Sequence, residues 1–326
     1  MASDRIKGLE DAAIKRFIKG SELSEYYYKA PLIVAYSGGK DSDVLVNIAE
    51  KSGKPFECIY SVTTLDAPQT TRHMNEVFAR LEAKGIKCTR KSPTYHGEPT
   101  NMWKLIKLKE MPPTRRVRYC CQILKETSTP NRMVALGVRR AESFGRSSRG
   151  EFEYRTRTAP KKGSNAFDYD HTKQVFDDAV RVQQELNQSN NEPNSYDCTF
   201  ISKLKKQKDT VVNPIIDWTD TDIWDYIRAE DIETNPLYFP PYNFARVGCI
   251  GCPMAGTKGM LKEFALFPDR QEKFIRAFDE MIAYRVSRGL ETKWKTGEEV
   301  FHWWVGDNIL PGQTTLFDLV DEEGGL

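Results

Sequence analysis

Two short stretches of the sequence carry side chains that can do chemistry, and the first is a glycine loop. It lies between an apolar run and a segment with helical periodicity, and it consists of Ser37, Gly38, Gly39, Lys40, Asp41 and Ser42. Glycines leave backbone N–H groups open, and the N-terminus of a helix favours anions, so the loop predicts a phosphate site. Lys40 adds a positive charge, and Asp41 could cap the helix or help to hold Mg²⁺. The order differs from the common G-x-x-x-x-G-K-[ST] loop, and an ordinary glycine turn is the alternative interpretation.

The second stretch is a set of cysteines in two motifs. Cys120 and Cys121 are adjacent, and Cys249 and Cys252 form a CxxC. Four thiolates are the ligands of a [4Fe–4S] cluster and equally suit a structural zinc. A CxxC by itself also suits a redox pair. The residues alone therefore leave iron–sulfur and zinc open.

The remaining cysteines and the composition limit the possible protein classes. Seven cysteines without a secretory signal argue against a disulfide framework. Cys58 and Cys88 are expected core residues in strands, and Cys198 has no assigned role. No stretch reaches the roughly 20 apolar residues of a membrane helix, so a cytoplasmic protein without membrane contact is expected. The net charge of +2 does not argue for nucleic-acid binding, and basic runs at 155–163 and 202–209 are interpreted as solvated surface.

Strands and helices alternate around the glycine loop. Buried strands are predicted at 32–36, 55–64 and 86–92, with helices at 41–52 and 70–85 between them. This alternation is typical of an α/β fold with a parallel twisted sheet and flanking helices. Ligands of such sheets bind beyond the carboxyl ends of the strands, which is where the glycine loop lies.

Composition divides the chain into parts. We predict an N-terminal helix at 1–27, a nucleotide-binding α/β domain at 28–150 and 211–265, a polar and partly mobile insertion at 151–210, and a helical C-terminal region at 266–326. Within these parts, further strands are predicted at 131–138 and 210–218. One further helix is predicted at 101–111 and another inside the insertion. A third is predicted to begin at a cap, either Thr219 or Thr221.

Several of these segments resemble known families. The string SGGKDS resembles the PP-loop of the ATP pyrophosphatase superfamily. The CC and CxxC pattern resembles the iron–sulfur-containing branch of the phosphoadenosine phosphosulfate (PAPS) reductase family, and 137–149 resembles that family's arginine-bearing loop. Segments 213–227 and 235–238 are also similar, so the resemblance extends over about 28–265. It implies an adenine nucleotide alpha hydrolase-like fold that binds ATP and Mg²⁺, with a [4Fe–4S] cluster on the four paired cysteines.

The resemblance also implies roles for individual residues. The implied catalytic residues are Lys40, Asp41, Arg139 and Arg140. The implied nucleotide contacts are the loop from Ser37 to Ser42 together with Asp66, Thr70, Gly137 and Arg139. Trp218, Trp224 and Ile227 are interpreted as packing residues.

One departure from the family decides the predicted function. The family's reductases carry a catalytic cysteine near the C-terminus, in a motif like ECGLH, and no cysteine follows Cys252 here. Since a nucleophilic mechanism needs its nucleophile, we predict an enzyme that splits ATP to activate an acceptor for sulfur transfer. DNA phosphorothioation proteins are similar in this respect, which suggests a DNA or RNA acceptor and a sulfur donor such as a cysteine desulfurase. The alternatives are a sulfonucleotide reductase using another thiol, such as Cys198 or a partner's, and a non-catalytic ATP-binding scaffold that meets a partner through Trp303 and Trp304.

Overall fold

The computed structural model describes residues 4–125, 132–147, 149–157 and 207–306. The chain divides into two compact units. The first unit comprises 1–61, 68–91 and 127–247, and the second comprises 62–67, 92–126 and 248–326. The helix predicted inside the insertion, Cys198 and the end of the chain after residue 306 lie outside the described residues.

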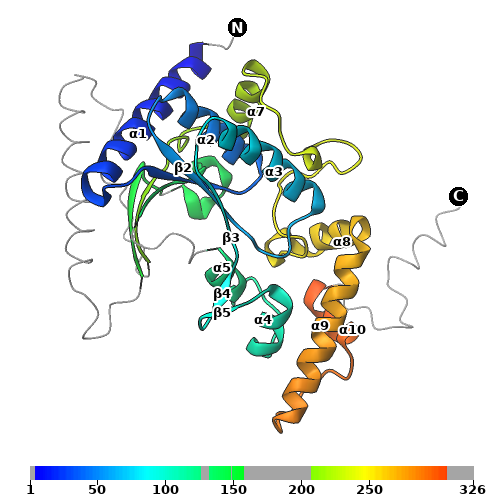
Figure 1. The fold of residues 1–326 in the computed structure, drawn as a ribbon. Helices are drawn as coiled ribbons and strands as arrows, with labels where there is room; N and C mark the ends of the chain where they lie inside the picture. Colours follow the sequence, from blue (N-terminus) through cyan, green and yellow to red (C-terminus); the bar gives the residue numbers. More distant parts are fainter. Residues whose placement is uncertain (1–3, 126–131, 148, 158–206, 307–326) are drawn as a thin grey trace, which may run out of the picture. The chain divides into compact units, whose positions relative to one another are not determined.

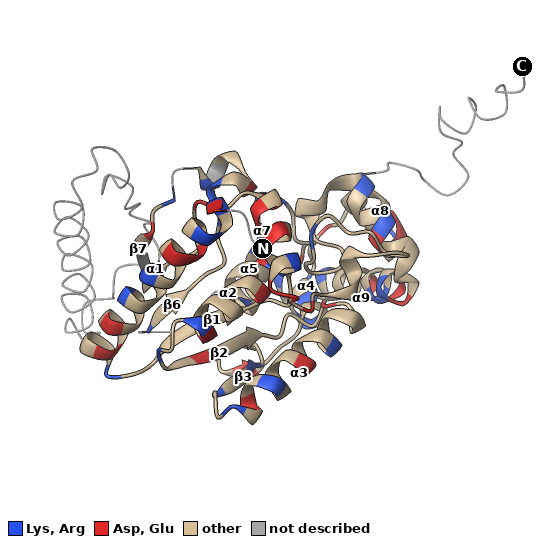
Figure 2. Ribbon diagram, turned by 90° about the horizontal axis from the view of Figure 1, so that it is seen from above, with Lys and Arg blue, Asp and Glu red and all other residues tan. Residues whose placement is uncertain are grey.

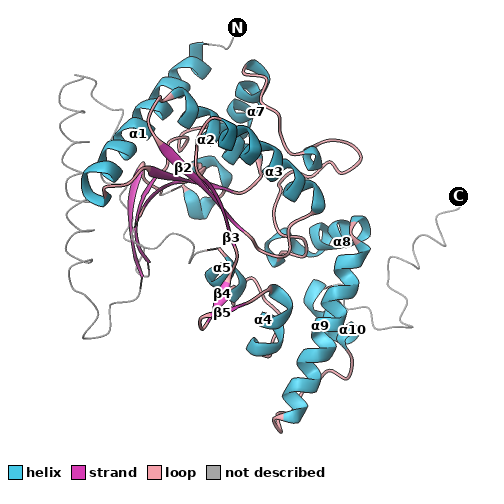
Figure 3. Ribbon diagram, viewed as in Figure 1, coloured by secondary structure: helices cyan, strands magenta, loops and turns pink. Residues whose placement is uncertain are grey.

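The first unit is built on a twisted sheet (Figure 3). In the described residues its strand order is β3-β2-β1-β6-β8-β7. The strands are β1 (Leu32–Tyr36), β2 (Phe56–Ser61), β3 (Cys88–Lys91), β6 (Met133–Ala135), β7 (Phe152–Arg157) and β8 (Gln207–Val212). All neighbours are parallel except β7, which pairs antiparallel with β8. The predicted α/β class with a mainly parallel sheet is therefore confirmed.

Four helices of the first unit frame the sheet (Figure 1): α1 (Asp4–Tyr28), α2 (Lys40–Lys51), α3 (Pro68–Ala83) and α7 (Asp220–Ala229). Helix α2 packs against β1 and α1, and α1 also packs against β6 and β8. The spacing of Val44, Leu45 and Ile48 places all three on one face of α2, and each is fully buried. Lys, Arg, Asp and Glu residues are interspersed along the helices (Figure 2).

The second unit is mainly helical. Its helices are α4 (Met102–Lys109), α5 (Tyr119–Leu124), α8 (Gly256–Leu266), α9 (Pro268–Ser287) and α10 (Gly297–Val305), and a short hairpin joins β4 (Thr94–Tyr95) to β5 (Glu98–Pro99). Its core is aromatic and contains Phe264, Phe274, Phe278, Phe301 and Trp304. Asn101 caps α4 by accepting from the Lys104 N–H at 2.9 Å, and α4 ends before Pro112, as the sequence predicts.

Three features differ from the sequence-based expectations. Strands β7 and β8 occupy both ends of the segment predicted as a polar insertion, and β7 makes the edge of the sheet antiparallel. Helix α5 was not predicted, because six residues are too few to show helical periodicity. Residues 92–126 and 248–265, assigned from the sequence to the α/β domain, cluster with the C-terminal helices. Among the described residues, no helix combines the length and apolar character needed to span a membrane.

Candidate nucleotide site and cysteine cluster

The glycine loop turns the chain from β1 into α2, and its backbone requires glycine. Gly38 has a φ of +74°, and a Cβ there would lie 2.8 Å from Thr70 Cγ2. The Asn235 Nδ2 donates to the Gly38 carbonyl at 2.8 Å and to Thr70 Oγ1 at 3.1 Å. Both Thr70 and Asn235 are buried. The loop is therefore held by side chains from α3 and from the segment after α7.

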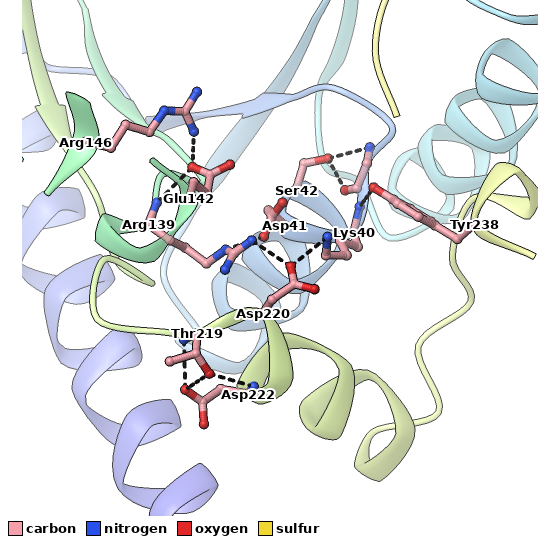
Figure 4. A network of polar contacts seen from close by, with 11 residues as sticks. Lys40, Asp41, Ser42, Arg139, Glu142, Arg146, Thr219, Asp220, Asp222 and Tyr238 are labelled. Carbon is pink, nitrogen blue, oxygen red and sulfur yellow. Dashed lines mark hydrogen bonds and ion pairs between the residues drawn. The ribbon is translucent and has the colours of Figure 1, made fainter. Parts of the chain in front are cut away.

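Hydroxyl oxygens face the N–H groups of the loop (Figure 4). The Ser37 and Gly39 N–H groups both donate to Ser42 Oγ, at 3.3 and 3.2 Å, and the Lys40 N–H donates to the Tyr238 hydroxyl at 3.0 Å. Ser42 Oγ in turn donates to the Gly39 carbonyl at 2.7 Å. Two amides that converge on one oxygen at a helix N-terminus form the kind of concavity that binds phosphate oxygens.

Two buried cations stand beside the loop and share one carboxylate (Figure 4). The Lys40 Nζ lies 2.9 Å from Asp220 Oδ1, and the Arg139 Nη2 lies 3.1 Å from the same oxygen. Arg139 also pairs through Nε with Asp41 Oδ1 at 2.6 Å. Lys40 and Arg139 are only 4% and 3% exposed, whereas the Asp220 side chain is 62% exposed. Although partial burial acts in the opposite direction, the two cations lower the pKa of Asp220.

The segment after β6 adds further positive charge in the first unit. Burial, followed by the charges of Arg246 and Arg149, lowers the pKa of Arg146 to about 10. Within the described residues, Arg149 Nη2 is buried and has no hydrogen-bond acceptor. Arg146 pairs with Glu142. Arg149 pairs with Glu153 through Nε, so each of the two arginines has a carboxylate partner, and Arg149 Nη2 is the donor that a bound anion could use.

Some of the residues predicted from the sequence lie at the glycine loop in the structure, and others lie elsewhere. Gly137 lies against the loop, since a Cβ there would be 3.0 Å from the Asp41 carbonyl oxygen. Arg140 pairs with Asp217 and donates to the Arg149 carbonyl at 3.0 Å. Asp66 belongs to the second unit, where Oδ2 accepts from the Thr63 N–H at 3.1 Å. The structure thus brings Thr70, Gly137 and Arg139 to the loop, and the roles predicted for Asp66 and Arg140 stay predictions.

Sequence reasoning missed three residues of the site: Asp220, Asn235 and Tyr238. They belong to segments that carried a family resemblance but were interpreted as packing or as connections. Thr219, one of the two predicted caps, does begin α7, because its Oγ1 accepts from the Asp222 N–H at 3.2 Å. That cap positions Asp220 at the first turn of α7. Trp218 and Ile227 are buried, as predicted for packing residues, while Lys40 Nζ lies 5.6 Å from the centre of the Trp224 ring.

The four paired cysteines all belong to the second unit. Cys120 and Cys121 lie on α5, and Cys249 and Cys252 flank a turn before α8. A hydrogen bond with Cys121, burial and the neighbouring Cys249 together raise the pKa of Cys120. Burial also raises the pKa of Cys249, against the effect of Lys125. The two motifs, more than a hundred residues apart in sequence, therefore lie close enough for their thiols to interact.

Several contacts of the second unit hold the turn between Cys249 and Cys252. The Ile250 N–H donates to the Leu65 carbonyl at 2.9 Å, and the Gly251 N–H donates to Glu263 Oε2 at 2.7 Å. Arg115, which precedes α5, donates through Nε to the Pro253 carbonyl at 3.0 Å. The bond from Arg115 connects the segment of the CC motif to the segment of the CxxC motif, and the other two fix the CxxC turn against Leu65 and helix α8.

The cysteine set can be tested for its fit to a metal centre. Four thiols on two neighbouring segments are the right donors for a [4Fe–4S] cluster or for zinc. Lys125 interacts with the thiols of Cys249 and Cys121 and would offset thiolate charge. Among the described residues, however, no three His, Cys, Asp or Glu side chains converge on one point. The donor chemistry fits a thiolate-bound centre, and loading would require the side chains to turn toward one another.

Comparison with known proteins identifies the family. Residues 31–255 match the sequence profile of the phosphoadenosine phosphosulfate reductase domain. This chain belongs to that family. It is 26% identical over 265 residues to an uncharacterised protein of Methanocaldococcus jannaschii, covering 77% of this chain and 43% of the relative. It is 28% identical over 216 residues to sulfate adenylyltransferase subunit 2 of Phocaeicola vulgatus, covering 64% of this chain and 59% of the relative.

Other similarities of this PAPS reductase family member are more local or more distant. It is 41% identical over 63 residues to the adenosine 5′-phosphosulfate reductase of Staphylococcus saprophyticus, covering 19% of this chain and 25% of the relative. The PAPS reductase of Candida auris, in a phosphate complex, has a TM-score of 0.36 and 12% identity, covering 76% of this chain and 96% of that one. The chain spans about half the length of the first curated relatives that it matches, 43% and 53%.

Proposed function

We propose that this protein is an ATP pyrophosphatase-type enzyme that activates an acceptor for sulfur transfer. The observation that carries the proposal is the pair of nearly buried cations, Lys40 and Arg139, at the N-terminus of α2. Their shared partner, Asp220, is mostly exposed, so an incoming phosphate can replace it without leaving a charge buried. The match to a sulfate adenylyltransferase subunit supports chemistry at the α-phosphate of ATP.

The proposed reaction forms one bond and breaks one bond in each of two steps. An acceptor oxygen attacks the α-phosphorus of ATP, the bond between the α-phosphorus and the bridging oxygen breaks, and pyrophosphate leaves with that oxygen. A sulfur nucleophile then displaces AMP from the adenylated acceptor. In the first step Lys40 and the loop amides hold the departing phosphates, and Arg139 offsets their growing negative charge. Asp41 and Asp220 are the carboxylates that would hold Mg²⁺ together with substrate phosphates.

The cysteine cluster is proposed to hold a [4Fe–4S] cluster through Cys120, Cys121, Cys249 and Cys252. When bound, such a cluster exchanges electrons or handles sulfur. Lys125 and Arg115 would balance the charge of the thiolates and keep the two cysteine segments together. A DNA or RNA acceptor and a sulfur donor of the cysteine desulfurase type complete the proposal. The basic runs at 155–163 and 202–209, which could meet DNA phosphates, lie largely outside the described residues.

The local identity to an adenosine 5′-phosphosulfate reductase favours one second candidate, a sulfonucleotide reductase. The loop and arginines would then hold a phosphosulfate in place of the phosphates of ATP. This candidate requires a nucleophilic thiol other than the family's, because no cysteine follows Cys252. Release of sulfite from adenylylsulfate would distinguish it from the leading proposal.

The proposal is tested on anaerobically purified protein. Calorimetric titration measures ATP binding, and a coupled assay measures pyrophosphate release with plasmid DNA or tRNA as acceptor. Lys40→Ala is expected to weaken ATP binding by at least about tenfold, the cost of one lost charged hydrogen bond. Lys54→Ala is the matched control, because Lys54 lies in the same unit and pairs with Glu22 at the surface. Equal ATP affinity of the two variants, or sulfite release without pyrophosphate, would overturn the proposal.

A further inference from the structure

An acidic cavity lies in the first unit, on the side of α2 that faces α3 and the segment following α7. Its volume is about 430 Å³, within the range of small-molecule sites. Five of its lining residues are acidic and one is basic: Asp43, Glu76, Glu230, Asp231 and Glu233, with Arg80. Neither the proposed ATP chemistry nor the cysteine cluster uses this cavity.

Internal ion pairs do not neutralise the lining. Arg80 is engaged by Glu50, which lies outside the cavity, at 2.8 Å. Glu230 is paired with Lys51 at 2.6 Å. Three more of the five acidic residues, Glu76, Asp231 and Glu233, form no ion pair with Lys or Arg in the part of the chain that the structure describes. The cavity therefore carries a negative field.

Asp43 provides the observation that points to a ligand. It is only 4% exposed, and its Oδ1 accepts from the Tyr36 hydroxyl at 2.6 Å and lies 3.0 Å from His73 Nε2. Its Oδ2 is buried and has no hydrogen-bond partner among the described residues. A buried carboxylate oxygen without a donor costs free energy, and burial raises the pKa of Asp43, so a donor that enters from the cavity would stabilise the ionised carboxylate. The cavity that Asp43 lines is the place from which that donor can come.

His73 lies next to Asp43, and its pKa responds to the carboxylates around the cavity. Burial of the imidazole acts against its protonation, yet the pKa of His73 is raised. The cause is the hydrogen bond and charge of Asp43, together with the charges of Glu233 and Glu76. Even with His73 protonated and Asp43 left out, the four remaining acidic residues of the lining outnumber His73 and Arg80. The site still favours a ligand with more than one positive charge.

We propose that this cavity binds a small organic polycation of the polyamine class. Ammonium groups have three donors and no acceptor, which matches a lining of carboxylates, and their hydrogen bonds to carboxylates are charge-assisted. One ammonium group meets Asp43 Oδ2, and a second, further along the same chain, meets Glu76 or Glu233. A directly bound metal ion fits less well, since the described residues hold no group of three ligands arranged for one. Because Asp43 directly follows Ser42 of the loop, the site adjoins the phosphate-binding turn.

The experiment is calorimetric titration of the full chain with spermidine at low ionic strength, with 1,8-octanediol as the uncharged probe of similar length. Spermidine is expected to bind to one site, and the diol is not. Asp43→Asn keeps an acceptor for Tyr36 and His73 but removes the charge, and it should weaken spermidine binding by about tenfold. Since Asp43 is buried, the exposed double variant Glu76→Gln, Glu233→Gln serves as a second test that leaves the core unchanged, with a similar loss expected.

The matched control is Glu82→Gln, which removes a carboxylate from the same helix α3 but outside the cavity. It should leave spermidine affinity unchanged. A loss in Glu82→Gln as large as in the cavity variants would mean general attraction to acidic surface and would overturn the proposal. It would also fail if wild-type protein bound no spermidine, or if magnesium chloride occupied the cavity while spermidine did not.

Discussion

Replacing Gly251 with alanine tests how the turn between Cys249 and Cys252 is held. Gly251 has a φ of +73°, and a Cβ there would lie 2.7 Å from Phe264 Cζ, 2.8 Å from Phe274 Cε2 and 3.1 Å from Trp304 Cη2. Phe264 and Phe274 are buried and pack edge-on, with ring centres 5.7 Å apart, so neither ring can move without disturbing the other. The substitution therefore combines backbone strain with overpacking of the aromatic core.

The two costs can be separated with a second glycine of the same unit. Gly289 has a φ of +71°, and a Cβ there would meet nothing within 4 Å. Gly289→Ala should cost about 1 kcal/mol, the strain of a left-handed residue with a side chain. Gly251→Ala should cost that amount plus about 1–3 kcal/mol for overpacking.

Urea unfolding followed by tryptophan fluorescence measures both free energies, because Trp103 and Trp304 lie in the aromatic core of the second unit. The midpoint of Gly251→Ala should fall well below that of Gly289→Ala at an unchanged slope. Equal urea midpoints for the two variants would show that the aromatic rings move aside for the added methyl group without a cost in stability. The turn would then not be fixed by close packing, and the argument for a rigidly held CxxC segment would be lost.

Two further predictions concern the two candidate sites. Asp220→Asn should lower the free energy of unfolding by less than about 1 kcal/mol, since the carboxylate is largely exposed. Because the pKa of Asp220 is lowered on folding, this contribution is present above the unfolded value of 3.8 and disappears as the pH falls through the folded value. Urea unfolding of both proteins across this range should show convergence in acid, and a constant difference would contradict it. For the cysteines, Cys249→Ser should lose the iron of anaerobically purified protein, whereas Cys58→Ser, in β2 of the first unit, should retain it. Iron analysis of the purified variants measures this difference, and a full iron content in Cys249→Ser would exclude the proposed ligand set.

The element pattern around the glycine loop was predictable because it is local. The apolar run 32–36 became β1 with the predicted bounds, and the apolar face of α2 appears in the sequence at helical spacing. Strand β7 was not predictable in this way. It contains charged residues, and its place in the sheet depends on the register of Phe152 with Val212, 60 residues further along the chain. No local pattern encodes such a pairing.

In the candidate site, too, the residues that are contiguous in sequence were predictable and the residues that are distant in sequence were not. The loop was found because Ser37 to Ser42 are contiguous, and Thr70 because it follows the next strand. Asp220 and Tyr238 are about 180 to 200 residues distant from the loop, and they reach it only because the sheet places β1 beside β6 and β6 beside β8. Their residue types are common at helix starts and in loops. Only the three-dimensional arrangement distinguishes them from ordinary capping or packing residues.

Which of Arg139 and Arg140 faces the glycine loop depends on the direction in which each side chain leaves the backbone after β6. Arg139 has φ −125° and ψ 143°, and successive side chains of extended backbone point to opposite sides. Only one of the two can face the loop, and Arg139 does so through Asp41 and Asp220. Arg140 begins the short helix η1 (Arg140–Glu142) and pairs with Asp217. The sequence RR cannot reveal which arginine meets the nucleotide, because that depends on where β6 ends. In the proposed reaction Arg139 would therefore act on the phosphates, whereas Arg140, through Asp217, anchors the segment that carries Arg139.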